Sequence, residues 1–142
     1  MSTETNKAIV RRLEEQVWNK HRLDLFEEFY TEDTILHAAS FPSRSGLQAV
    51  KEDVAMMLNV YPDIQVAEED MIAEGDEVVL RWTMRGTHQG ELLGIPPTGN
   101  QVTSSGVTIF RLVNGKIAEE WFWPDNLNSF QQMGVIPALG TA

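Results

Sequence analysis

A long hairpin near the C-terminal end of the chain constrains its fold most. Two strand-like runs, residues 101–112 and 116–123, are joined by the tight turn Val113-Asn114-Gly115. Asn-Gly favours a hairpin because both residues tolerate the positive φ angles that a two-residue turn requires. The Pro/Gly-rich connection 94–99 precedes the first run. We therefore expect two antiparallel strands, followed by a short amphipathic helix over 126–133.

Helical patterns come first along the chain, and strand patterns come later. Apolar residues recur at helical spacing over 3–19, and a second, short helix is expected over about 23–30. The box Ser45-Gly46-Leu47-Gln48 predicts the start of a third helix, which ends before Pro62. The other strand candidates are 34–38, 64–73 and 77–88. This segregation predicts a single α+β domain over residues 1–142, with a curved antiparallel sheet wrapped around the N-terminal helices.

Composition limits the partners and the compartment. Eleven basic and 21 acidic residues give a net charge of −10, which argues against nucleic acid and an anionic membrane surface as partners. No apolar run approaches the roughly 20 residues of a membrane span, and the polar start MSTETNKAIVRR lacks a signal-peptide core. The absence of cysteine excludes disulfides and thiolate chemistry. We expect a cytoplasmic protein.

The familiar metal, cofactor and nucleophile motifs are missing from the sequence. Three scattered histidines without cysteine give no metal-ligand spacing, so we predict no metal site. There is no Gly-x-Ser-x-Gly elbow. The Gly-rich stretch near Gly94 lacks both a P-loop lysine and a dinucleotide fingerprint, so no cofactor is expected.

The chain resembles a known family over nearly its whole length. The motifs GTHQGELLGIPPTG, NGKIAEEW and WPDNLNSFQQMG are similar to those of SnoaL-like polyketide cyclases, within the nuclear-transport-factor-2-like superfamily. The resemblance implies a cone-shaped α+β fold with a central apolar cavity and a homodimer packed through the sheet faces. It also implies ring closure of aromatic polyketide esters without a metal or organic cofactor. The superfamily includes isomerases, hydrolases and binding proteins, so the fold alone does not fix the function.

The resemblance also locates the family's catalytic positions, and this chain departs from them. In the aldol cyclases the acid/base Asp lies three positions before the Asp of the Trp-Pro-Asp triplet, which is Phe122 here. The assisting His and Gln match Thr108 and Gly106. Removing a proton next to a carbonyl needs a base, and none of these three side chains can be one. The usual aldol mechanism therefore lacks its catalytic set in this chain.

Three other residues are the candidates for acid/base chemistry. Asp125 follows Trp123 and Pro124, but it also precedes a predicted helix, where Asp is a preferred N-cap. His37 ends a predicted strand, and its ordinary pKa near neutrality suits proton transfer. Strand alternation places Glu120 on the same face as Phe122, so it faces the cavity if Phe122 does. The same alternation turns Trp121 and Trp123 outward, which would mark a dimer interface.

Strand and helix parity also predicts the walls of a binding pocket. These walls are mostly apolar and suit a hydrophobic polyketide-like ligand better than a sugar or a nucleotide. The candidate substrate-binding residues are Met57, Tyr61, Trp82, His88, Thr108, Phe110, Phe122 and Trp123.

Three functions remain open at this point. The first is a cofactor-independent cyclase or isomerase in which Asp125 and His37, with Glu120 as a further candidate, move protons. The second is a hydrolase or hydroxylase-like enzyme that activates water. The third is a non-catalytic protein that binds a hydrophobic ligand, in which Asp125 only caps the last helix.

Overall fold

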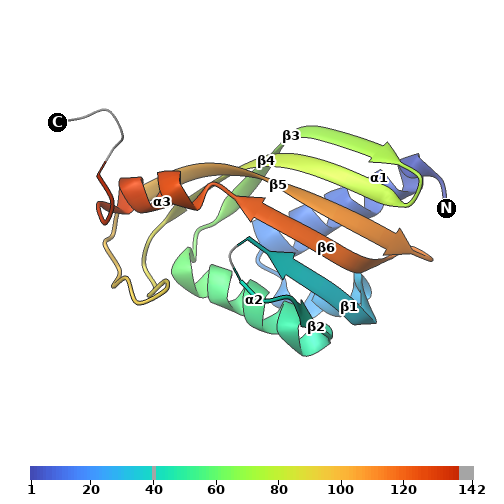
Figure 1. Ribbon diagram of the computed structural model, residues 1–142, viewed down its shortest axis with the longest axis horizontal. Coiled ribbons are helices and arrows are strands. Elements are labelled where there is room, and N and C mark those ends of the chain that lie inside the picture. The colour runs from blue at the N-terminus through green and yellow to red at the C-terminus, as the bar shows by residue number, and fades with distance from the viewer. Residues whose placement is uncertain (40, 138–142) are drawn as a thin grey trace.

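The protein folds as a curved sheet with helices packed on one face (Figure 1). The computed structural model describes residues 1–39 and 41–137. The helical segments are α1 (Thr3–Leu13), the π-helical η1 (Glu14–Asn19), the 3-10 helix η2 (Leu23–Glu28), α2 (Leu47–Val60) and α3 (Asn126–Met133). The strands are β1 (Tyr30–Ala38), β2 (Arg44–Ser45), β3 (Gln65–Glu74), β4 (Glu77–Thr87), β5 (Gln101–Val113) and β6 (Lys116–Pro124).

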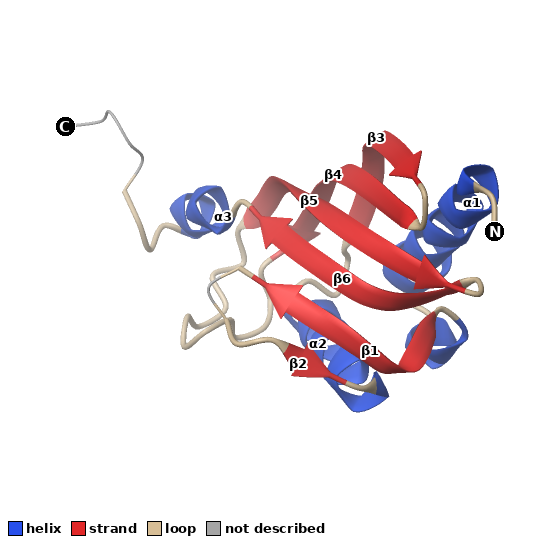
Figure 2. Cartoon of the chain, turned by 45° about the vertical axis from the view of Figure 1, so that its right-hand side comes forward, coloured by secondary structure: helices blue, strands red, loops and turns tan. Residues whose placement is uncertain are grey.

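The predicted α+β class is confirmed, and the sheet is open rather than closed into a barrel. Its six strands lie in the order β2-β1-β6-β5-β4-β3. The predicted hairpin forms between β5 and β6, and its turn residues Asn114 and Gly115 have φ angles of 50° and 81°. All neighbouring pairs are antiparallel except β1 and β6, which run parallel, so the expectation of a wholly antiparallel sheet needs this correction. Figure 2 shows α1 and α2 behind the sheet, and α3 beyond the edge where β6 ends and β5 begins.

Local structure differs from the sequence expectation at three places. The first helix does not stay α-helical to residue 19, because its last six residues form the π-helical segment η1. Strand β1 begins at Tyr30, where it pairs with Ile117 before its register shifts. The predicted capping box is wrong: Ser45 lies in β2 opposite Ile35, and the N-cap of α2 is Gly46, without a side-chain hydrogen bond.

Alternation along the long strands separates a core face from an outer face. On β4 the side chains of Val78, Leu80, Trp82 and Met84 are buried, while Arg81 and Arg85 between them are exposed. The core also receives Val10, Leu13 and Val17 from the first helix and Val50 and Val54 from α2. The concave face of the sheet therefore faces the helices, as predicted.

Gly106 creates space for one large side chain on this face. It lies opposite Trp82 in the β4–β5 register, and a Cβ at Gly106 would overlap the Trp82 ring and lie 2.9 Å from the Trp123 carbonyl oxygen. The indole of Trp82 donates a hydrogen bond of 2.9 Å to the Thr108 hydroxyl. Trp82 also stacks on Phe122, with ring centroids 5.7 Å apart. The missing side chain at Gly106 thus fixes the place of the Trp82 ring.

The substitution Gly106→Ala should therefore displace Trp82 and destabilise the fold. We expect a loss of about 1–3 kcal/mol, the usual range for overpacking a core, in urea denaturation followed by tryptophan fluorescence. Ser105→Ala, at the adjacent exposed position of β5, is the matched control. Equal stability of the two variants would contradict this account of Gly106.

Candidate functional site

A cavity of about 460 Å³ lies between the concave face of the sheet and the helices. Its walls come from η1, β1, α2, β4, β5, β6 and α3, and from the loop that carries Leu92 and Leu93. Most of the lining is apolar and aromatic. Six of the eight predicted substrate-binding residues line it, namely Met57, Tyr61, Trp82, Thr108, Phe110 and Phe122. The cavity is large enough for a small multi-ring molecule.

Three carboxyl groups line this otherwise apolar cavity. Glu120 comes from β6, Asp53 from α2 and Glu14 from the first turn of η1. The only arginine among the lining residues is Arg44, and its guanidinium is already paired with Asp53 at 2.7 Å and with Glu52. Glu14 and Glu120 consequently have no cationic partner among the described residues. The cavity combines apolar walls with an excess of acidic groups.

Glu120 occupies the best-defined polar position in the cavity. Strand parity places it on the same face as Phe122, and both line the cavity, as the alternation predicted. The buried Tyr30 hydroxyl donates a hydrogen bond of 2.8 Å to Oε1 of Glu120. Desolvation raises the pKa of Glu120 from 4.5 to about 7, although the bond from Tyr30 opposes this shift. Glu120 can therefore both accept and donate a proton near neutral pH.

Glu14 and Asp53 extend the acidic character of the cavity. Burial raises the pKa of Glu14 from 4.5 to about 8, and the nearby charge of Glu120 raises it further in the same direction. Burial also raises the pKa of Asp53, while its ion pair with Arg44 opposes the shift. Both Glu14 and Glu120 therefore hold a proton to a higher pH than an ordinary glutamate.

The three positions that the resemblance assigns to the catalytic trio lie together on one wall of the sheet, and none of them carries an ionisable group. Thr108 and Phe122 are partners in the β5–β6 register, and Gly106 is opposite Trp82 on β4. The Trp82 indole fills the space over Gly106 and binds the Thr108 hydroxyl. Neither Phe122 nor Thr108 can act as a base. The carboxyl group nearest along the strand is Glu120, two residues before Phe122.

His37 lies at the cavity border, but its ring is engaged on the outer side of the sheet. Its Nδ1 is 2.6 Å from the Ser43 hydroxyl, and its Nε2 is 2.7 Å from Oε2 of Glu119. The ring also stacks on Trp121, with centroids 5.3 Å apart. Glu119 in turn accepts a bond of 3.1 Å from Arg111. These contacts join His37 to Ser43 and Glu119, and not to Glu120 or to Asp125, its predicted catalytic partner.

Asp125 forms the predicted helix cap. Its side chain accepts a bond of 3.1 Å from the backbone N–H of Asn128, which satisfies a free donor in the first turn of α3. Asp125 is exposed and is not among the residues that line the cavity.

Two other predicted residues also lie outside the cavity lining. His88 is fully buried and braces the loop to Gly99, because its ring Nδ1 lies 3.0 Å from the Thr98 hydroxyl. Trp123 has 54% of its surface exposed on the outer face of the sheet. Neither residue lines the cavity, so neither has the position that the predicted substrate-binding role requires.

Sequence reasoning missed Glu14, Asp53 and Tyr30. Glu14 is four residues after Val10 and four before Trp18, so it lies within the apolar stripe of the first helix. Asp53 has the same kind of position between Val50 and Met57. A carboxylate in an otherwise apolar stripe was the available signal. Tyr30 gave no such signal, because tyrosine is common in ordinary cores.

Residues 1–39 and 41–137 contain no group of three or more His, Cys, Asp or Glu side chains arranged to hold a metal ion. Within the same residues, no helix is long and apolar enough to cross a membrane.

The raised pKa values of Glu14 and Glu120 make the stability of the fold depend on pH. Between pH 4.5 and about 8 the folded chain keeps protons that the unfolded chain has released, so these two groups lower the stability as pH rises. Each pKa unit of difference is worth about 1.4 kcal/mol. We expect the free energy of unfolding from urea titrations to fall between pH 5.5 and 8.5. This fall should be smaller in Glu14→Gln and Glu120→Gln, and parallel pH profiles in all three proteins would contradict it.

Comparison with known proteins identifies the family and the fold. The family model described as SnoaL-like polyketide cyclase matches residues 8–133. The aklanonic acid methyl ester cyclase DauD of Streptomyces sp. (strain C5) is 29% identical over 129 residues, which are 89% of this chain and 80% of that protein. AclR, a putative hydroxylase from Streptomyces galilaeus, superposes with a TM-score of 0.87 at 28% identity, over 99% of this chain and 87% of AclR.

A putative SnoaL-like polyketide cyclase from Jannaschia sp. CCS1 gives the same TM-score of 0.87 at 26% identity, and 95% of each chain is covered. The fold expected from the resemblance is thus confirmed by solved structures. The chain belongs to the SnoaL-like polyketide cyclase family.

Proposed function

We propose that this protein is a cofactor-independent cyclase or isomerase of a neutral, hydrophobic, polyketide-like molecule, with Glu120 as its acid/base. The observation that carries the proposal is a carboxyl group on the cavity wall, held by Tyr30 and poised to change protonation near neutral pH. This group stands in for the catalytic Asp of the aldol cyclases, whose position the resemblance assigns to Phe122. Asp125 keeps its place as a helix cap in this proposal.

Glu120 can complete a ring closure without any other reagent. Its carboxylate removes a proton from the carbon next to a carbonyl, and the resulting enolate carbon attacks a second carbonyl to form the new C–C bond. The alkoxide then takes the same proton back from Glu120, so no atom or electron is left over. Tyr30 is a positioning residue, because its hydroxyl holds Oε1 of Glu120 and leaves Oε2 for the substrate.

The cavity walls would hold the substrate in the folded shape that closes the ring. The stacked pair Trp82 and Phe122 gives a flat surface against which an aromatic ring system can lie. Holding the two reacting carbons close together can supply a large part of the rate enhancement. This contribution needs no polar group at Phe122.

The charges of the cavity favour a neutral substrate. Glu14, Asp53 and Glu120 oppose a ligand carboxylate, and Arg44 is already paired. Relatives such as DauD are named as cyclases of a methyl ester, in which the carboxyl charge is masked. We therefore propose a polyketide ester, rather than a free acid, as the substrate class.

Substituting Glu120 by Gln should abolish most of the activity. We expect kcat on aklanonic acid methyl ester, the ester that DauD is named for, to fall by about 10²–10⁴-fold because the acid/base group is lost. Product formation is followed by liquid chromatography and mass spectrometry. Glu27→Gln removes an exposed carboxylate from η2 and is the matched control.

The variant Asp125→Asn distinguishes the remaining alternatives, because Asn preserves helix capping. Loss of activity in this variant, with Glu120→Gln still active, would contradict Glu120 as the base. Ligand binding without turnover in the wild type would favour the non-catalytic binding protein. Formation of a hydrated or hydroxylated product would instead favour the hydroxylase-like alternative, which the name of AclR also brings forward.

We also propose that two copies associate through the outer face of the sheet. Trp123 is exposed there, and Trp121 and the His37 ring share this face. An exposed tryptophan on a sheet face is typical of an interface. The homodimer and the cytoplasmic location remain predictions from the sequence and from the resemblance.

Trp123→Lys should weaken this dimer, because a charge would be buried in its interface. Analytical ultracentrifugation should then show a shift from dimer to monomer relative to the wild type. Ala55→Lys, at an exposed position of α2 on the other side of the sheet (Figure 2), should leave the mass unchanged. A dimer that survives Trp123→Lys would contradict this choice of face.

A further inference from the structure

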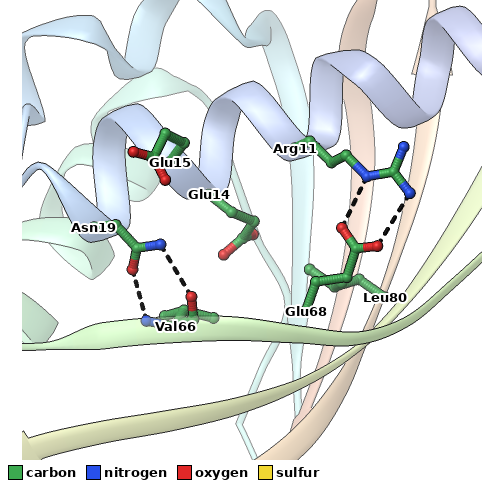
Figure 3. A pocket seen from close by; sticks show the side chains of 7 residues that line it. All are labelled: Arg11, Glu14, Glu15, Asn19, Val66, Glu68 and Leu80. Carbon is green, nitrogen blue, oxygen red and sulfur yellow. Dashed lines mark hydrogen bonds and ion pairs between the residues drawn. The ribbon is translucent and has the colours of Figure 1, made fainter.

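Glu14 lies at the boundary between the cavity and a second pocket. It is one of the residues that line the main cavity, and it also lines a pocket of about 320 Å³ between the first helix and β3. Val66 is shared by both in the same way. Figure 3 shows the Glu14 carboxyl in the space between the helix and the strand. A group at such a boundary can exchange protons with both sides.

Two polar contacts join the first helix to β3 on either side of Glu14 and border the second pocket (Figure 3). On one side Asn19 pairs with the backbone of Val66, donating a bond of 3.0 Å and accepting one of 2.6 Å. On the other side Arg11 forms two bonds with Glu68, at 2.9 and 3.0 Å. The side chains of Arg11 and Glu68 are 50% and 36% exposed, so this pocket communicates with solvent. Its volume is enough for several water molecules.

Glu14 has the charge environment of a proton carrier rather than of an ion pair. On the pocket side Arg11 is engaged by Glu68, and the other charged group there is Glu15. On the cavity side the ionisable groups are Glu120, Asp53, Tyr61, Arg44, whose guanidinium is paired, and His37, whose ring is engaged by Ser43 and Glu119. Tyr30 lies behind Glu120. The Glu14 carboxyl makes no hydrogen bond or salt bridge with the other described residues. Its proton is therefore not held by a specific partner.

Glu14 is the first residue of a π-helical segment. The segment η1 begins at Glu14, directly after the last α-helical residue Leu13. π-helical turns are rare and often occur at functional sites. Here Glu14 lines the cavity from the start of this segment, and Val17 within it is buried.

A bound substrate creates a need for such a carrier. A ligand lying against Glu120 would separate this group from the rest of the cavity. Because desolvation raises the pKa of Glu120 to about 7, some ligands would meet the base in its protonated form. Glu120 can then be reset only through a route that the ligand does not block.

We propose that Glu14 relays protons between Glu120 and the solvent-open pocket beside β3. The relay rests on the proposed function, since it serves Glu120 as the base. Glu14 releases its proton to a water molecule in the pocket and then receives the proton held by Glu120. The O–H bonds of Glu14 and Glu120 break, one O–H bond forms on water and one forms again on Glu14, so Glu120 is left as the carboxylate and the pocket water as hydronium, which passes the proton to solvent.

The first test follows deuterium uptake by 2-tetralone, an apolar ketone with acidic C–H groups, in D₂O by NMR. The wild type should catalyse uptake at C1, and Glu120→Gln should not. Glu14→Gln should slow uptake about tenfold or more, because Glu120 returns the same proton to the ketone. Imidazole, which is small enough to enter the second pocket, should restore the rate of Glu14→Gln without accelerating the wild type. Glu27→Gln is the matched charge control.

The outcomes separate the relay from the base. Uptake that is unchanged in Glu14→Gln but lost in Glu120→Gln would overturn the relay and keep the proposed function. A slow Glu14→Gln that imidazole does not rescue would also overturn the relay, since a structural defect gives this result. Uptake that survives Glu120→Gln would overturn the proposed base.

A second test needs no ligand and keeps the relay falsifiable if 2-tetralone does not bind. With ¹³C-labelled glutamate, the Glu120 carboxyl resonance should titrate in two steps in the wild type, because its charge interacts with that of Glu14. In Glu14→Gln the same resonance should titrate in one step. A single step in both proteins would show that the two groups are not coupled and would overturn the relay.

Discussion

The pairing of β6 with two neighbours decides what this molecule can do. Strand β6 lies between β1 and β5, and its register with both is fixed by hydrogen bonds along most of its length. Because side chains alternate along a strand, a shift by one residue would exchange Glu120 for Glu119 on the cavity side. Glu119 instead binds His37 and Arg111 on the outer face, and this pairing lowers the pKa of Glu119. The pKa values of these two adjacent glutamates therefore shift in opposite directions, because their side chains lie on opposite faces of the sheet.

Much of the fold could be predicted from local patterns. Strands β4, β5 and β6 and helix α3 were located to within one residue, because the Asn-Gly turn and Asp125 are strong local signals. Alternation also predicted that Glu120 and Phe122 share one face of β6, while the inward direction of that face rested on the resemblance. The cap predicted at Ser45 failed because tertiary pairing with Ile35 draws this residue into β2. The parallel pairing of β1 with β6 joins segments far apart in the chain, which local patterns cannot reveal.

The candidate site was harder to predict, because its polar groups come from distant segments. Tyr30 and Glu120 are 90 residues apart in the sequence, yet one hydrogen bond joins them. Glu14 was missed, although it lies in the apolar stripe of the first helix, because nothing local shows that the sheet covers this stripe. Asp125 and His37 are chemically suitable, but the structure engages one in capping α3 and the other with Ser43 and Glu119. Residue type alone could not distinguish these positions from those in the cavity.

The way in which Trp82 lies over Gly106 also affects how such a site could change over evolution. A single replacement of Phe122 by Asp would place a second carboxylate against the Trp82 ring, where no group stands ready to hold it. The resemblance assigns the Gln and His that assist this Asp in the aldol cyclases to Gly106 and Thr108. In this chain the Trp82 indole fills the space over Gly106 and donates a hydrogen bond to the Thr108 hydroxyl. Exchange between the two arrangements would require several coordinated substitutions. The Trp82 indole and a side chain at position 106 thus compete for the same space on this scaffold.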